Sequence, residues 1–217
     1  MIVAARAAGR DVTTEAYPYA AGMTEIKSAN LDEYEKPDAN LSVLEWPRTG
    51  ERLNRESFEK YRKIGGPVVL HTNTEEMVKA AVTSPLTMIA SDAYWENGVG
   101  HPRTTGTYSK VLGRFVREQQ ALTLMDAIRK MTLMPARRLE ARVPAMRTKG
   151  RLRTGADADI AIVDAATVID RSTYREPALA PIGIRHVLVN GVVVVANGRA
   201  VDGVTPGQPV RAPAIRP

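Results

Sequence analysis

Short apolar runs alternate with polar loops and helix signals over the first two thirds of the chain. Residues 2–8 are typical of the last turns of a helix, and residues 11–16 alternate as a strand does. Apolar runs at residues 68–70 and 86–90 predict two short buried strands. Residues 23–60 are polar and irregular, apart from one helix. We expect helices at residues 55–63, 75–81, 108–118 and 124–142.

The pattern changes near Lys149, and no helix signal follows it. Asn190-Gly191 is a dipeptide typical of the tight turn in a β hairpin. We predict two regions, an α/β part over residues 1–145 and a small all-β part over residues 146–217 that ends in a proline-rich tail. The strands of the second region are expected at residues 158–163, 184–189 and 192–196.

Composition changes this picture little. The chain has 217 residues, of which 44% are hydrophobic and 25% charged, as in a folded globular protein. Its net charge of +6 invites a nucleic-acid interpretation, but lysines and arginines are spread along the whole chain, so we expect no nucleic-acid partner. The absence of cysteine excludes disulfides and thiolate metal sites. No apolar stretch approaches the ~20 residues of a membrane span, and we expect a cytoplasmic protein.

Asp92 is the strongest candidate for a catalytic group. It follows a very apolar strand in the sequence LTMIASD, and catalytic carboxylates of α/β barrels occupy that position because loops at the C-terminal edge form the active site. A capping or turn aspartate is the alternative. Arg103, in the following loop, carries a rigid fork of donors suited to a carboxylate, and His101 beside it fits a ligand, a base or a structural donor. For both, a solvated loop residue is the alternative.

Aromatic and histidine residues supply weaker candidates. Tyr17-Pro18-Tyr19 follows the first strand, where a tyrosine hydroxyl can enter a cleft or the rings can simply pack. His71 ends a strand and can face the same edge, whereas His186, inside the all-β part, fits a structural role. The sequence contains no HxH, HExxH or DxDxDG pattern and no phosphate-binding loop, so it does not present a complete metal site.

Together these segments resemble one enzyme family. The resemblance to strands seven and eight of N-acyl-D-amino-acid deacylases lies in DVTTEAYPYAAGMT and SDAYWENGVGHPRTTGTYSKVLGRFVRE. The resemblance to the small β-sandwich of the amidohydrolase superfamily lies in KGRLRTGADADIAIVDAATVID and IRHVLVNGVVVVANGRA. It implies an α/β fold in which residues 1–145 are the C-terminal part of the (β/α)8 TIM barrel of a metal-dependent hydrolase (about strands 7–8). Residues 146–217 would then form the small β-sandwich.

The resemblance also implies an activity and a division of roles. N-acyl-D-amino-acid deacylases hydrolyse a linear amide bond and release a D-amino acid and a carboxylate. One or two zinc ions lie at their barrel mouth, and most of the zinc ligands precede the region that this chain resembles. Asp92 matches the catalytic aspartate and is a candidate metal ligand. Arg103 and Tyr17 match the residues that hold the substrate α-carboxylate, and His101 and Tyr19 match supporting positions of the substrate site.

The resemblance leaves the enzyme incomplete. Two strands cannot close an eight-stranded barrel, so we expect a missing N-terminal segment or a partner chain, and no hydrolysis by this chain alone. Met23 stands where deacylases often have a small polar residue, which would reshape the acyl pocket. Two alternatives stay open. One is a hydrolase of cyclic amides, like dihydroorotases and hydantoinases, which Arg103 disfavours because it suits a free carboxylate; the other is a non-catalytic remnant or interaction module.

Overall fold

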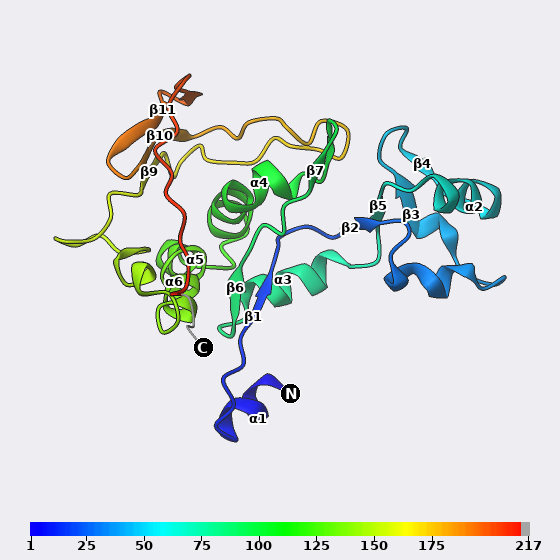
Figure 1. The fold of residues 1–217 in the computed structure, drawn as a ribbon, viewed down its shortest axis with the longest axis horizontal. Helices are drawn as coiled ribbons and strands as arrows, with labels where there is room; N and C mark the ends of the chain where they lie inside the picture. The colour runs from blue at the N-terminus through cyan, green and yellow to red at the C-terminus, as the bar shows by residue number, and fades with distance from the viewer. Residues whose placement is uncertain (214–217) are drawn as a thin grey trace.

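A pair of parallel strands lies at the centre of the molecule, whose structure, a computed structural model, describes residues 1–213 (Figure 1). β1 (Thr14–Ala16) pairs with β6 (Thr87–Ile89), which confirms the strands predicted there. The parallel pairing places the C-terminal ends of both strands at one edge. The N-terminal helix α1 (Ile2–Ala7) contributes no buried residue.

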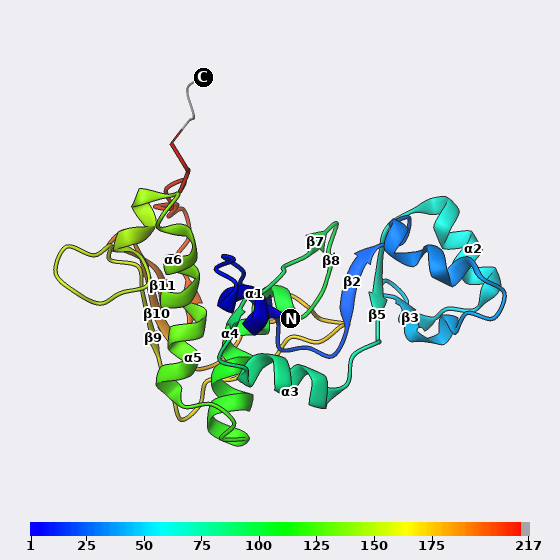
Figure 2. The ribbon, with the colours of Figure 1, turned by 90° about the horizontal axis from the view of Figure 1, so that it is seen from below.

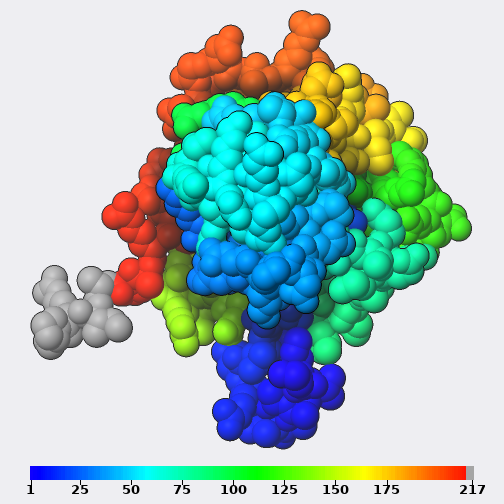
Figure 3. Space-filling model, turned by 90° about the vertical axis from the view of Figure 1, so that its right-hand side faces the viewer, coloured from blue at the N-terminus to red at the C-terminus, as the bar shows by residue number. Residues whose placement is uncertain are grey.

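A four-stranded antiparallel sheet with the order β2–β5–β3–β4 forms a lobe of its own, which we call the small lobe (residues 22–70; Figure 1). This lobe faces the viewer in Figure 3. Trp46 stacks on Tyr61 in its core, with ring centroids 4.0 Å apart. The prediction that residues 23–60 are irregular is wrong, because strands of two to four residues joined by 3-10 turns leave no hydrophobic period to read. The elements are β2 (Gly22–Glu25), η1 (Ala29–Glu35), η2 (Leu41–Val43), β3 (Leu44–Trp46), β4 (Glu51–Arg52), α2 (Arg55–Ile64) and β5 (Pro67–Leu70).

One helix connects the small lobe to the central pair, and a hairpin and further helices follow that pair. α3 (Glu75–Thr83) runs back from the lobe to β6 (Figure 2). The loop expected between Asp92 and Arg103 is only partly irregular, because a hairpin forms there and α4 begins at Arg103. The Asn97-Gly98 turn of this hairpin has positive φ at both residues, and that dipeptide is the signal that identifies it. The bounds are β7 (Trp95–Glu96), β8 (Val99–Gly100), α4 (Arg103–Lys110) and the π-helix η3 (Val111–Glu118).

The predicted helix at residues 124–142 is two helices. α5 (Leu124–Met131) is followed by Thr132, whose φ of −129° and ψ of −71° lie outside the helical range. α6 (Leu133–Leu139) follows at once. Pro135 explains the break, because it has no N–H to donate and its ring clashes with the carbonyl four residues earlier.

The last sheet is antiparallel, with the order β12–β11–β10–β9, and it confirms the strands predicted in the second region. Asn190 and Gly191, at φ of 47° and 78°, form the predicted turn between β10 and β11. Val168, in the link from β9 to β10, lies in one core cluster with Phe115 of η3. The elements are η4 (Pro144–Thr148), β9 (Ile160–Val163), β10 (Ile184–Val189), β11 (Val192–Ala196) and β12 (Arg199–Ala200).

The two predicted regions share that core, so a boundary at residues 145 and 146 remains a prediction. Residues 214–217, the end of the expected proline-rich tail, lie outside the described residues. In the part of the chain that the structure describes, no helix combines the length and the apolar character needed to cross a membrane.

Candidate active site

Asp92 and Arg103 form an ion pair at the C-terminal edge of the central strands. Asp92 follows β6 in a left-handed backbone conformation, with φ of 47°, and one carboxylate oxygen lies 2.7 Å from Arg103 Nη2. Arg103 Nε also donates to the Asp92 carbonyl oxygen at 2.6 Å. The arginine side chain is 3% exposed and the aspartate side chain is 65% exposed. The cation of the pair is therefore buried, while the carboxylate faces solvent.

Tyr17 lies against the same guanidinium group. It follows β1 as Asp92 follows β6, so the parallel pairing of the strands brings the two loops together. The guanidinium carbon of Arg103 lies 4.3 Å from the centre of the Tyr17 ring, which is a cation–π contact. Asp92 uses two of the five N–H donors of Arg103, so three N–H groups are not bonded to Asp92. Three of the sequence candidates thus meet at one place.

His101 lies inside the protein, not in a solvated loop, with an exposed fraction of 0%. Its Nδ1 accepts the backbone N–H of Arg103 at 3.0 Å, so its Nε2 donates to the carbonyl of Ala21 at 2.9 Å. Burial, together with the charge of Arg103, lowers the pKa of His101 to about 3, and the ring is neutral at pH 7. With both nitrogens engaged, the imidazole joins the loop after β1 to the start of α4.

Tyr19 also faces the interior. Its hydroxyl donates to Asp170 at 2.9 Å, and its ring lies edge-on to His101 with the centroids 5.5 Å apart. The ammonium of Lys110 lies 3.9 Å from the centre of the Tyr19 ring. Burial and the negative charge of Asp170 raise the pKa of the Tyr19 hydroxyl, which keeps it a neutral donor. Tyr19 is therefore a buried packing partner of His101.

Two residues from the region after β9 complete this cluster, and neither was predicted from the sequence. Asp170 accepts the Tyr19 hydrogen bond, and the ring of Tyr174 packs edge-on against His101 with centroids 5.0 Å apart. Burial raises the pKa of Tyr174 to about 12. Both lie far along the chain from the His-Pro-Arg turn, in a stretch without a helix or strand period, so no local signal identified them.

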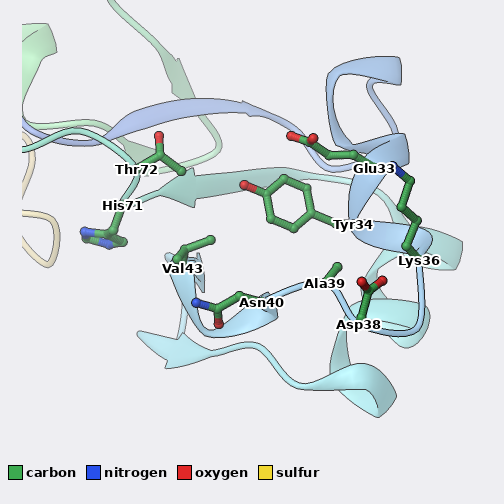
Figure 4. Close-up of a pocket in the computed structure, with 9 residues that line it drawn as sticks. All are labelled: Glu33, Tyr34, Lys36, Asp38, Ala39, Asn40, Val43, His71 and Thr72. Atoms are coloured by element: carbon green, nitrogen blue, oxygen red, sulfur yellow. The ribbon is translucent and has the colours of Figure 1, made fainter.

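His71 also packs against Tyr174, with ring centroids 5.4 Å apart. Its Nε2 lies 3.0 Å from a carboxylate oxygen of Glu45, although burial lowers the pKa of the imidazole. His71 borders an open cavity of about 470 Å³ in the small lobe, and Tyr34 points across that cavity (Figure 4). The other lining residues are Glu33, Lys36, Asp38, Ala39, Asn40, Val43 and Thr72.

Met23 is buried close to this cluster. It is 8% exposed, and Tyr94 and Tyr174 pack against the apolar group that contains it. A place in an acyl pocket remains a prediction for this side chain. His186 lies elsewhere, on β10, where it pairs with Ile162 of β9.

Among residues 1–213, no three or more His, Asp or Glu side chains gather in a group that could hold a metal ion. Zinc sites need at least three protein ligands. Asp92 is engaged by Arg103, and both nitrogens of His101 are bonded to backbone groups. These residues do not form a zinc site by themselves, and a metal at this edge would need ligands from outside them.

Comparison with known proteins places these features in a family. The family model described as "Amidohydrolase family" matches residues 3–195. An N-acyl-D-glutamate deacylase from Alcaligenes xylosoxydans xylosoxydans is 34% identical over 88% of this chain and 40% of its own length. A D-aminoacylase from the same organism is 29% identical over 89% of this chain and 40% of its own length. The chain thus spans about two fifths of the length of these relatives.

Solved structures give the same result at the level of the fold. The N-acyl-D-glutamate deacylase from Bordetella bronchiseptica, in complex with zinc and a phosphonate inhibitor that mimics the tetrahedral intermediate, matches with a TM-score of 0.78 and 31% identity. That match covers 97% of this chain and 45% of the solved chain. A D-aminoacylase studied for its binuclear metal centre matches with a TM-score of 0.76 and 26% identity, over 93% of this chain and 43% of its own.

Proposed function

The chain belongs to the amidohydrolase family, and on that premise we propose that its site serves the hydrolysis of N-acyl-D-amino acids. The reaction cleaves a linear amide bond and yields a D-amino acid and a carboxylate. Relatives named N-acyl-D-glutamate deacylase and D-aminoacylase support the proposal, because their matches extend over most of this chain.

We propose that β1 and β6 correspond to strands seven and eight of a (β/α)8 barrel, and that β9 to β12 belong to a small β-sandwich. The parallel pairing of β1 with β6 and the antiparallel order of the last sheet support this assignment. The other barrel strands would come from an N-terminal segment or a partner chain outside these 217 residues. The greater length of the relatives is consistent with such a source.

The observation that carries the proposed function is the Asp92–Arg103 ion pair stacked on Tyr17. An N-acyl-D-amino acid has a free α-carboxylate, and a guanidinium group with N–H donors to spare binds that group well. In a hydantoin the corresponding carboxyl carbon is part of the ring, so that cyclic amide offers no such carboxylate. The geometry therefore favours a linear substrate, with its carboxylate on Arg103 and its amide bond beside Asp92.

We propose that Asp92 moves the proton in this reaction. A water oxygen attacks the amide carbon while the carboxylate accepts a proton from that water. The protonated carboxyl group then gives the proton to the amide nitrogen as the C–N bond breaks and the amine leaves. The exposed carboxylate gives water and substrate access, and the buried Arg103 holds it in one orientation.

We propose that the complete site uses zinc, the metal of the solved N-acyl-D-glutamate deacylase complex. The ligands would come from outside the described residues, which do not supply a set of their own. For this reason we expect the chain alone to release no D-amino acid.

A chimera tests the proposal. The present chain replaces the matching part of the N-acyl-D-glutamate deacylase from Alcaligenes xylosoxydans xylosoxydans, so that the relative supplies the rest of the protein. We expect zinc-dependent release of the D-amino acid from a panel of N-acetyl-D-amino acids, and none from the L enantiomers. A chimera that folds and binds zinc but hydrolyses no member of the panel would refute the proposed function.

A further inference from the structure

A segment from the C-terminal region passes over the start of α4. The link between β9 and β10 leaves the antiparallel sheet, crosses above α4 to the neighbourhood of β7, and returns (Figure 1). We call residues 168–179 of this link the crossing segment. Gly113 of η3 allows the close approach, because a Cβ there would lie 2.5 Å from the Val168 carbonyl oxygen.

The crossing segment is bonded to both ends of the turn that carries Arg103. Ser172 Oγ donates to the carbonyl of Pro102 at 2.9 Å. Thr105 Oγ1 donates to the carbonyl of Pro177 at 2.8 Å. The backbone on either side of Arg103 is therefore fixed by residues about 70 positions away in the sequence.

Asp170 and Tyr174 bring the same segment into contact with the side chains behind Arg103. Asp170 holds the Tyr19 hydroxyl at 2.9 Å, and the Tyr174 ring lies edge-on to His101 at 5.0 Å. Tyr19 packs on the same imidazole at 5.5 Å. His101 is thus gripped between two tyrosine rings, one of them tied to the crossing segment and the other part of it.

These contacts also constrain Arg103, because His101 Nδ1 accepts the backbone N–H of Arg103 at 3.0 Å. A tilt of the imidazole would move the first residue of α4. The guanidinium group has little freedom to compensate, since it is stacked on Tyr17 and bonded twice to Asp92.

We propose that Asp170 and Tyr174 are positioning residues, which fix the orientation of the Arg103 guanidinium group through Tyr19 and His101. The C-terminal region then contributes to the site by positioning Arg103. The inference rests on the proposed function only because that function assigns the substrate carboxylate to Arg103. The contacts that position Arg103 are present in the protein without substrate.

Hydrogen exchange of two side-chain protons tests the inference on the 217-residue protein. Nitrogen-15 NMR follows Arg103 Nε–H and His101 Nε2–H, and backbone amides of β10 report global opening. In Tyr174→Ala and Asp170→Ala we expect both protons to exchange about tenfold faster than in the wild type, relative to those amides, because the local aromatic and hydrogen-bond contacts are lost. Tyr174→Phe, which keeps the ring, and Asp170→Asn, which keeps an acceptor, should restore the wild-type rates.

Matched controls separate positioning from general loosening. Tyr108→Ala removes an exposed tyrosine from α4 itself, and Asp202→Ala removes an exposed aspartate after β12; both should leave the two rates unchanged. If Tyr174→Ala does not fold, Tyr174→Leu keeps most of the apolar volume and serves instead. Unchanged exchange of both protons in folded Tyr174 and Asp170 variants would overturn the inference. An inactive chimera with faster exchange in these variants would sink the proposed function alone.

Discussion

Asp92 and Arg103 depend on one another unequally. The guanidinium group of Arg103 is almost fully buried and pairs with the Asp92 carboxylate through Nη2, whereas the carboxylate is mostly exposed to water. A buried charge that loses its partner is costly, while an exposed one regains solvent. Arg103 is therefore the member whose placement the structure secures, and Asp92 the member left accessible for chemistry.

Replacing Asp92 by asparagine keeps the size of the side chain and removes its ability to take a proton. In the chimera we expect Asp92→Asn to lower kcat by about 10²–10⁴-fold, the usual contribution of a positioned general base. Asp11→Asn is the matched control, because Asp11 also pairs with an arginine, Arg138, at an exposed position. Steady-state kinetics measure both, and equal kcat values for the two variants would rule out a proton-transfer role for Asp92.

The buried His101 should make the stability depend on pH. Its pKa is about 3 in the folded protein and about 6.5 in an unfolded chain, so the unfolded state binds the proton more tightly. The free energy of unfolding therefore falls as the pH drops through the window between these values. Between pH 6.5 and pH 5 the loss due to this residue is roughly 2 kcal/mol.

Urea unfolding of the wild type and of His101→Asn at these two pH values measures that loss. Asparagine does not titrate, so the variant should lose roughly 2 kcal/mol less than the wild type over the same interval. An equal loss in both proteins would mean that His101 is not held neutral by burial. Direct NMR titration of the wild-type imidazole gives the same information if the variant is too unstable to compare.

Five of the side chains at the candidate site could be found from the sequence, because each lies in a short motif after a strand or in the His-Pro-Arg turn. The structural environment of these side chains could not be predicted in the same way. His101 had a solvated loop as its alternative, yet it is buried, since its partners are a backbone carbonyl 80 residues away and a ring from the crossing segment. Asp170 and Tyr174 follow no local period, and only the tertiary fold brings them to the site.

Elements of regular period were predictable, and those of two to four residues were not. The helix α3, the strand β6 and the Asn190-Gly191 turn follow directly from capping, apolar runs and turn chemistry. The sheet of the small lobe could not be predicted, because its strands pair across long loops and its core residues are spaced by 3-10 turns. The π-helix η3 has a helical sequence pattern, and its Gly113 lies close to the crossing segment.

That contact gives a test of how η3 and the crossing segment fit together. Alanine is the better helix former by about 1 kcal/mol, yet a Cβ at Gly113 would meet a backbone oxygen at 2.5 Å, and overpacking typically costs about 1–3 kcal/mol. We therefore expect Gly113→Ala to lower the free energy of unfolding. Gly207→Ala, where no atom lies within 4 Å, is the control and should change it by less than about 0.5 kcal/mol. A stabilised Gly113→Ala variant, measured by urea unfolding, would show that the two elements are not in tight contact.

At the scale of the whole molecule, the candidate side chains and the residues that pack against them come from distant parts of the chain. Arg103, Tyr17 and Asp92 lie at one edge of two parallel strands, and the crossing segment is hydrogen-bonded to Pro102, next to Arg103. What the described residues do not contain is a metal-ligand set or enough strands to close a barrel. We therefore propose that this chain provides substrate binding and proton transfer, and that residues outside it bind the metal.

The release of D-amino acid in the presence of zinc, measured side by side for the purified 217-residue chain and for the chimera, decides whether that assignment is right. We expect turnover by the chimera and none above background by the chain alone. Zinc-dependent turnover by the isolated chain would contradict the account, because it would require a complete metal site among residues that do not provide one.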